Sequence, residues 1–225
     1  MRNVKDIGEV IRIADRESAI YELLRGCPLK ILKEFSVVTS SRGEFVLEQG
    51  RVYQSIFIVV SGVVAIYILS ADGRKYAISV CKRGSFIGEH EIFDGKPYSS
   101  QVEAISDVTL LEIKRAPFLE WMELDRNFCD LFIRGLCRQM YSLTQKAGTD
   151  TLYSLRARIC RFLVSAPVQS NNIQVSRVSL GELMGVTGRS VSRILKSLQD
   201  SGAIRCEPGR IAILDIEALR RESDE

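Results

Sequence analysis

Two arginines near the C-terminal end of this chain have the side chains and the spacing needed to read nucleic acid. Arg189 and Arg193 lie four residues apart, so in a helix they share one face. A guanidinium group donates two hydrogen bonds to O6 and N7 of guanine in the major groove of DNA. We therefore expect both arginines to read guanines, and the plain alternative for Arg189 is a phosphate contact or a solvated side chain.

Polar residues around this pair are candidates for the remaining contacts. Thr187 is placed to cap the helix by accepting a backbone N–H, and Gly188 follows at the first helical position. Ser190 is expected to contact a base or a phosphate. Phosphate contacts are expected from three more side chains, namely Arg177, Ser192 and Lys196. These six residues and the two arginines form the candidate nucleic-acid interface.

Two short helices must position these side chains. Apolar residues recur at helical spacing before and after Gly185, which interrupts the pattern. They are Leu180, Leu183 and Met184 in the first helix, which Ser176 is placed to cap, and Val191, Ile194, Leu195 and Leu198 in the second. A hairpin follows, with strands at 204–206 and 211–214 around a Pro208–Gly209 turn. This order is typical of a winged helix-turn-helix.

Positive charge is concentrated in the same part of the chain. Residues 151–213 hold nine basic and three acidic side chains, whereas residues 1–150 hold 20 of each. Lys and Arg supply most of the non-specific affinity for DNA because they neutralise phosphates. A basic stretch alone also fits a solvated surface, but beside a helix-turn-helix it predicts double-stranded DNA as the partner.

The middle of the chain is built of short strands. Apolar alternation and Gly or Asp boundaries indicate seven or eight strands between residues 35 and 113. They include segments at 44–48, 55–69, 75–80, 102–104 and 108–113, of which the second is divided by Gly62. Such regular spacing predicts an antiparallel barrel or sandwich and hence an α+β fold. One or two helices are expected before it, between Asp15 and Leu32.

A long helix is expected next, from Pro117, which is tolerated in a first turn, to about Ala147. One face repeats apolar residues at alternating spacings of four and three, as coiled-coil seams do, namely Cys129, Ile133, Leu136, Met140, Leu143 and Ala147. A second apolar face includes Phe128, Leu131 and Phe132. A helix with two apolar faces needs two partners. We expect the strands to cover one face and a second copy of the helix to cover the other; the alternative is burial within one domain.

The expected domains are helices and strands at 1–116, a dimerisation helix at 117–147 and the winged helix-turn-helix at 148–225. All apolar runs are shorter than the ~20 residues that a membrane-spanning helix needs. Charges interrupt the N-terminal segment, so we expect no signal peptide and no membrane partner. Six cysteines without a C-x-x-C pair are typical of reduced thiols, which predicts a cytoplasmic protein.

Four motifs stand out when the chain is taken as a whole. They are G-E-F-V-L-E-Q-G at 43–50, I-F-I-V-V-S-G at 56–62, G-S-F-I-G-E at 84–89 and L-M-G-V-T-G-R-S-V-S-R-I-L at 183–195. As a set they resemble the Crp/Fnr family of bacterial transcription regulators, over roughly residues 20–220. The resemblance implies an N-terminal antiparallel β-roll like the cyclic-nucleotide-binding jelly roll. It also implies a homodimer on palindromic DNA, in which an effector at the roll and long helix reorients the two DNA-binding domains.

The second helix of the helix-turn-helix departs from the pattern of that family. Its best-known members carry a glutamate, which accepts from cytosine, where Arg189 stands, whereas Arg193 matches the arginine of the family. A guanidinium has no acceptor atom. We therefore expect a palindrome of different sequence, with more guanine contacts.

The effector site of the family also matches only in part. Members that bind cyclic AMP hold the ribose with a Gly-Glu pair, which Gly88 and Glu89 match. They hold the cyclic phosphate with an Arg-Ser pair, which falls here on Tyr98 and Ser99. The missing arginine removes a charge-assisted contact worth about 1.5–3 kcal/mol. Cyclic AMP is therefore not the expected effector.

The long helix completes the candidate effector site. A Thr-Ser pair of the cyclic-AMP-binding members falls on Leu143 and Thr144, so only one hydroxyl remains. Tyr98, Ser99 and Thr144 still offer a polar set for another small molecule. The alternative for Glu89 is a turn or cap carboxylate without a ligand.

Other cofactors of the family are not expected. An iron–sulfur sensor would need closely spaced cysteines near the N-terminus, where Cys27 stands alone. A haem sensor would need a histidine near the roll, where His90 is the only one. Because Cys129 lies on the predicted helix seam, an intersubunit disulfide stays an alternative, although buried thiols more often pack as apolar side chains. We expect no metal site.

Other classes of protein fit the sequence less well. One histidine leaves little scope for acid–base catalysis, and P-loop, G-x-S-x-G and G-x-G-x-x-G motifs are absent, so we do not expect an enzyme. Two alternatives stay open: a DNA-binding regulator that is constitutive or controlled by thiol oxidation, and a cyclic-nucleotide-type regulatory module. The loop at 166–172 is a candidate contact for RNA polymerase.

Overall fold

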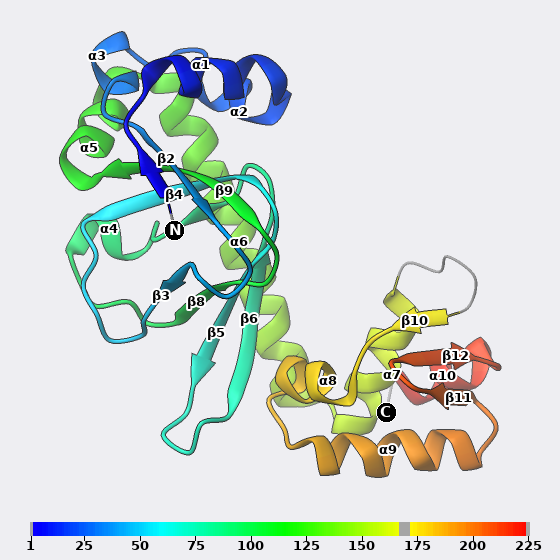
Figure 1. The fold of residues 1–225 in the computed structure, drawn as a ribbon. Coiled ribbons are helices and arrows are strands. Elements are labelled where there is room, and N and C mark those ends of the chain that lie inside the picture. The colour runs from blue at the N-terminus through cyan, green and yellow to red at the C-terminus, as the bar shows by residue number, and fades with distance from the viewer. Residues whose placement is uncertain (1, 167–171, 224–225) are drawn as a thin grey trace. The chain divides into compact units, whose positions relative to one another are not determined.

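The computed structural model describes residues 2–166 and 172–223 (Figure 1). Contacts divide the chain into two compact units, residues 1–69 with 78–139 and residues 70–77 with 140–225. Two hydrophobic clusters fill the first unit and a third fills the second. The predicted α+β class is confirmed. Most of the predicted 166–172 loop lies outside the described residues.

Short elements open the first unit: β1 (Arg2–Val4), α1 (Ile7–Arg16), α2 (Ser18–Leu24) and α3 (Leu29–Leu32). The sequence pattern placed helices only from Asp15 onward, so it missed β1 and α1. Asp6 caps α1, since its carboxylate accepts a hydrogen bond from the Gly8 backbone N–H at 2.8 Å. Val10 and Ile13 of α1 are buried in a core cluster that also holds strand residues.

Eight strands follow, in agreement with the predicted seven or eight. They are β2 (Ser36–Ser40), β3 (Val46–Leu47), β4 (Ser55–Ser61), β5 (Val64–Leu69), β6 (Lys75–Cys81), β7 (Phe86–Ile87), β8 (Gln101–Ala104) and β9 (Val108–Lys114), with α4 (Glu91–Asp94) between β7 and β8. They form two antiparallel sheets with the orders β1-β2-β9-β4-β7 and β3-β8-β5-β6.

The apolar run of β4 is buried on both faces of its sheet. Ile56, Ile58 and Val60 pack into the cluster that holds the helices. Phe57 and Val59 pack into a second cluster, between the two sheets. Alternate side chains of β4 therefore face two different cores, and neither face of this strand is turned to solvent. This explains why its sequence shows a continuous apolar run.

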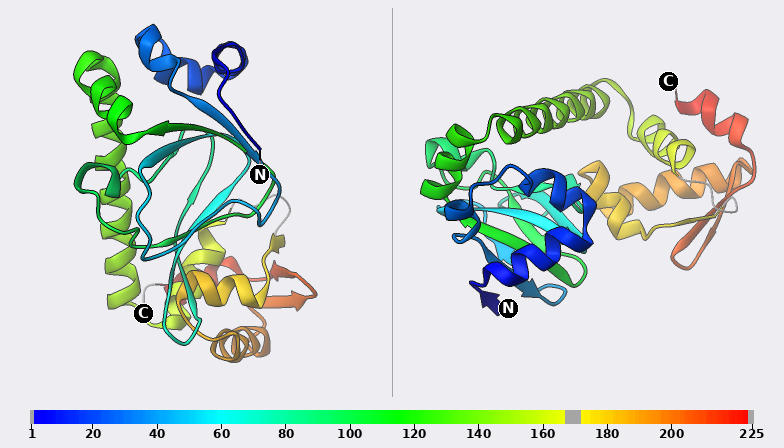
Figure 2. Two further views of the ribbon diagram at one scale, coloured as in Figure 1. Left: turned by 60° about the vertical axis from the view of Figure 1, so that its left-hand side comes forward. Right: turned by 90° about the horizontal axis from the view of Figure 1, so that it is seen from above.

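The predicted single helix over 117–147 is wrong in its bounds. The chain forms α5 (Arg115–Leu124) and then α6 (Arg126–Leu152), a continuous helix in both views of Figure 2. The two are separated at Asp125, which is buried. Its carboxylate accepts a hydrogen bond from the Phe128 backbone N–H at 3.0 Å and so caps the start of α6.

The second unit contains the predicted winged helix-turn-helix. Its elements after α6 are α7 (Leu155–Ser165), β10 (Asn172–Gln174), α8 (Arg177–Met184), α9 (Gly188–Asp200), β11 (Ile204–Glu207), β12 (Arg210–Ile213) and α10 (Ile216–Ser223). The hairpin of β11 and β12 is the wing, and β10 adds a third strand in the order β10-β12-β11. The sequence pattern missed β10 and α10. Among the described residues, no helix is long and apolar enough to span a membrane.

Candidate nucleic-acid interface

α8 has a defined start and a defined end. The Ser176 hydroxyl accepts a hydrogen bond from the Ser179 backbone N–H at 3.0 Å, which confirms the predicted cap. The helix ends at Gly185, whose φ of +67° is the left-handed conformation that glycine adopts without strain. The sharp turn into α9 therefore depends on Gly185.

The start of α9 is fixed by Thr187. Its hydroxyl accepts a hydrogen bond from the Ser190 backbone N–H at 3.3 Å and lies 3.1 Å from the Ser190 hydroxyl. This confirms Thr187 as the N-cap. Gly188 is the first helical residue and is exposed. The Ser190 hydroxyl, which was predicted to contact DNA, is thus held beside the cap.

α9 has a buried apolar face and an exposed basic face. Val191, Leu195 and Leu198 are at most 2% exposed and pack into the core of the second unit. Arg189 and Arg193 are exposed. The same holds for Lys196, and for Arg177 in the first turn of α8, while Ser192 is half-buried. The side chains of Arg189 and Arg193 therefore do not pack into the core and are accessible to a partner.

The wing supplies further basic residues, which the sequence-based list of contacts did not include. Arg205 and Arg210 are exposed on its two strands, and Arg205 lies 3.3 Å from the Glu207 carboxylate. A cavity of about 440 Å³ lies between the start of α8 and the wing, with Arg177 and Arg210 in its wall. The signal was present in the sequence, since Arg210 directly follows the predicted Pro208–Gly209 turn.

The seam predicted on α6 leaves large apolar side chains uncovered within one chain. Ile133 is 48% and Met140 is 69% exposed. Leu136 is partly buried against the core of the first unit, and the Cys129 thiol is free and half-buried. On the second predicted face, Phe128 and Phe132 are buried, whereas Leu131 is 38% exposed. Two of these three residues therefore pack on the roll, as expected.

Tyr98 and Gly88 lie against each other inside the roll. Gly88 has a φ of +88°, and a Cβ atom there would lie 2.0 Å from the Tyr98 hydroxyl oxygen. Tyr98 is 3% exposed, and its hydroxyl has no hydrogen-bond partner among the described residues. Burial raises its pKa well above the usual range of a phenol. The tyrosine therefore occupies space beside the predicted Gly88–Glu89 pair.

The carboxylates of Glu89 and Glu91 already have hydrogen-bond partners within the protein. The Glu89 carboxylate is buried and accepts a hydrogen bond at 2.8 Å from the side-chain amide of Gln139 on α6. Burial raises the pKa of Glu89, and the His90 ring, 3.7 Å away, opposes that shift. Ser99 donates to the Glu91 carboxylate from its backbone N–H at 3.1 Å and from its hydroxyl at 3.2 Å.

Family models match both parts of the chain. A cyclic nucleotide-binding domain matches residues 37–125, and a Crp-like helix-turn-helix domain matches residues 157–222. The chain belongs to the Crp/Fnr family. It is accordingly a DNA-binding regulator of transcription of the Crp/Fnr type, with α8 and α9 as its helix-turn-helix.

Relatives of known role agree with this assignment. The cAMP-activated global transcriptional regulator CRP of Salmonella typhimurium is 24% identical over 176 residues, which cover 74% of this chain and 84% of that protein. The nitrogen fixation regulation protein FixK of Bradyrhizobium diazoefficiens is 27% identical over 219 residues, with coverages of 92% and 91%. A CRP-family transcriptional regulator from Thermus thermophilus has a crystal structure that aligns with a TM-score of 0.65 and 25% identity, covering 84% of this chain and 97% of that one.

The last two residues of the predicted effector set lie on α6. Leu143 is half-buried, and the Thr144 hydroxyl donates to the Met140 carbonyl oxygen within the same helix, at 2.9 Å. Both belong to the second unit, whereas the roll residues of the set belong to the first. A Crp/Fnr effector site that includes them stays a prediction.

Proposed function

We propose that this protein is a homodimeric, sequence-specific regulator of transcription that binds a palindromic DNA site in the bacterial cytoplasm. The observation that carries the proposal is the exposed basic face of α9, on which Arg189 and Arg193 stand one turn apart behind a capped N-terminus. In a helix-turn-helix these N-terminal residues reach base edges in the major groove. Both arginines are proposed to read guanine.

The exposed seam of α6 supports the homodimer. Ile133 and Met140 are large apolar side chains that one chain leaves in water. Burial against a second copy would remove their surface from solvent, at about 25 cal/mol for each Å² of apolar area. Two-fold dimers place their reading helices about one DNA turn apart, on half-sites of an inverted repeat.

The proposed effector is a small molecule other than cyclic AMP, bound by the roll and α6. Tyr98 stands where cyclic-AMP-binding members of the family carry an arginine, and it fills space beside Gly88. A second candidate function follows from the same residues: DNA binding that needs no effector, with the roll as a scaffold. Its support is that Glu89 and Ser99 are bonded to other side chains of the protein.

Selection from random DNA tests the proposed function, and a mobility shift separates the two candidates. Protein purified in the presence of cell extract and protein purified without it are compared for affinity to the selected site. A difference supports effector control, and equal affinity supports the scaffold. Failure to enrich any inverted repeat contradicts both.

A further inference from the structure

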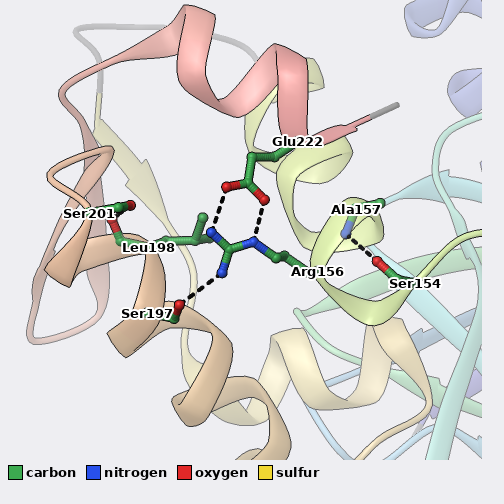
Figure 3. A network of polar contacts seen from close by, with 7 residues as sticks. All are labelled: Ser154, Arg156, Ala157, Ser197, Leu198, Ser201 and Glu222. Atoms are coloured by element: carbon green, nitrogen blue, oxygen red, sulfur yellow. Dashed lines mark hydrogen bonds and ion pairs between the residues drawn. The ribbon is translucent and has the colours of Figure 1, made fainter. Parts of the chain in front are cut away.

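One arginine of α7 contacts two other helices of the second unit. The Arg156 guanidinium donates to the Ser197 hydroxyl on α9 at 2.9 Å and to the Glu222 carboxylate on α10 at 2.6 Å (Figure 3). A second bond, from Nε to the same carboxylate, makes the pair bidentate. Arg156 therefore links α9, the helix proposed to read the bases, to the C-terminal helix α10. The sequence pattern did not predict α10.

The helices that carry Arg156 and Ser197 are both anchored in the core of the second unit. α7 begins at Ser154, whose hydroxyl accepts from the Ala157 backbone N–H at 3.1 Å, and Ala157 is fully buried. On α9, Ser197 is followed by Leu198, which is fully buried in the core of the second unit. The Arg156 side chain is 28% exposed, as is that of Glu222. The contact thus bridges elements that are themselves held in place.

Ser197 lies one helical turn after Arg193 on α9. Residues four apart share a face of a helix, so a rotation of α9 about its axis moves both side chains together. A bidentate contact between arginine and guanine tolerates little displacement, because sites of this kind must be held within about 0.5 Å. A contact that restrains Ser197 therefore also restrains the direction in which the Arg193 side chain points.

We propose that Arg156 is a positioning residue for base reading: clamped by Glu222, it fixes the rotation of α9 through Ser197. The inference rests on the proposed function, in which α9 reads guanines. Glu222 keeps the guanidinium in place, and the pKa of Glu222 is lowered chiefly by its hydrogen bond from Arg156. In this role α10 braces the reading helix, although it carries none of the proposed DNA contacts.

A direct phosphate contact by Arg156 is the competing explanation, and charge separates the two. Variants of the whole 225-residue chain are titrated against the selected operator and against scrambled DNA of equal length. Ser197→Ala removes no charge, and Glu222→Gln adds one net positive charge. If Arg156 only neutralised a phosphate, Glu222→Gln would tighten binding to both DNAs, since affinity follows counterion release.

If Arg156 fixes α9 in this way, Ser197→Ala, Glu222→Gln and Arg156→Met are each expected to lower the ratio of specific to non-specific affinity by about three- to tenfold, the range of the net contribution of one ordinary hydrogen bond. The double variant Arg156→Met/Ser197→Ala is expected to be no worse than Arg156→Met, because both changes break the same link. Ser201→Ala is the matched control. Ser201 directly follows α9, and its hydroxyl donates to the Leu198 carbonyl oxygen at 2.9 Å without contacting Arg156, so its loss is expected to leave the ratio unchanged.

Two results overturn the proposal: an unchanged ratio in Ser197→Ala and Glu222→Gln, or an equal loss in Ser201→Ala. Thermal unfolding checks that each variant folds. If Arg156→Met does not fold, Ser197→Ala at an exposed position still decides the question. If the unaltered protein fails to discriminate between the two DNAs, the proposed function fails instead of the clamp.

Discussion

The Tyr98 hydroxyl lies against Gly88, 2.0 Å from the point that a Cβ atom on Gly88 would occupy. Gly88 also has a φ of +88°, so both its backbone and its neighbour require glycine. Gly88 lies directly before Glu89, with which it forms the predicted Gly-Glu pair of the effector site. Tyr98 is a buried phenol whose hydroxyl has no hydrogen-bond partner among the described residues.

Tyr98→Phe is expected to leave the unfolding free energy unchanged or to raise it by up to about 1 kcal/mol, because the removed hydroxyl is buried and unpaired. Urea denaturation measures this. Tyr53→Phe is the comparison, since the Tyr53 hydroxyl accepts from the Glu48 backbone N–H at 3.0 Å and its ring packs edge-on against Tyr98. It is expected to cost about 0.5–1.5 kcal/mol. A loss of stability in Tyr98→Phe as large as in Tyr53→Phe would refute this description of Tyr98.

Cyclic AMP is expected not to stabilise the protein. A ligand at 100 times its dissociation constant adds about 2.7 kcal/mol to the unfolding free energy, which a thermal shift detects easily. Because the resemblance to the family predicts Tyr98 at the position of the arginine that pairs with the cyclic phosphate, no shift is expected at micromolar cyclic AMP. A rise of several degrees at that concentration would show that the roll binds the nucleotide without that arginine.

Glu89→Gln is expected to change how stability depends on pH. The pKa of Glu89 is raised in the folded protein, chiefly because burial disfavours the charged carboxylate; Glu91 acts in the same direction, and His90 and the bond from Gln139 oppose it. The folded state therefore holds this proton more tightly than the unfolded state. The unfolding free energy of the unaltered protein accordingly falls as the pH rises from the ordinary carboxyl value through the raised one.

Glutamine lacks that proton equilibrium and still offers an oxygen to Gln139. Glu89→Gln is thus expected to be more stable than the unaltered protein at pH 7, by a margin that shrinks toward acid pH as Glu89 takes up its proton. Urea unfolding between pH 5 and 8 measures the margin. Glu123→Gln, at an exposed position on α5, serves as the control. Parallel stability curves for Glu89→Gln and the unaltered protein would contradict the assignment.

Met140→Asp is expected to break the dimer. Met140 is 69% exposed in one chain and lies on the predicted seam. Burying an unpaired carboxylate costs several kcal/mol, so the dimer dissociation constant is expected to rise by more than about a hundredfold. Sedimentation equilibrium measures it. Gln145→Asp introduces the same charge at an exposed position off the seam and is expected to leave the dimer intact. Equal dissociation of both variants would exclude the seam as the interface.

The helix-turn-helix was predictable because its signals are local. Ser176 and Thr187 cap backbone groups three residues ahead, and Gly185 marks the turn by its type alone. Periodicity indicated the helices on either side for the same reason. The break at Asp125 was missed although aspartate is a good cap, because apolar residues continue at helical spacing on both sides of it.

The parts that could not be predicted depend on contacts between distant residues. Arg156 meets Ser197 and Glu222 across 41 and 66 positions of sequence, and no spacing rule pairs them. Ser99 was predicted to bind an effector, but its backbone N–H and its hydroxyl both donate hydrogen bonds to the Glu91 carboxylate. The resemblance to the family predicted a set of effector residues, but only tertiary packing decides what each of them contacts.

Selection of binding sites from random double-stranded DNA by the 225-residue protein is the decisive experiment for the proposed function. The enriched sites are expected to hold an inverted repeat with half-sites about one helical turn apart. Guanines are expected at the positions read by Arg189 and Arg193, and Arg189→Glu is expected to exchange one of these guanines for cytosine. Recovery of the half-site typical of cyclic-AMP-responsive relatives, or no change of the selected sequence with Arg189→Glu, would contradict base reading by Arg189.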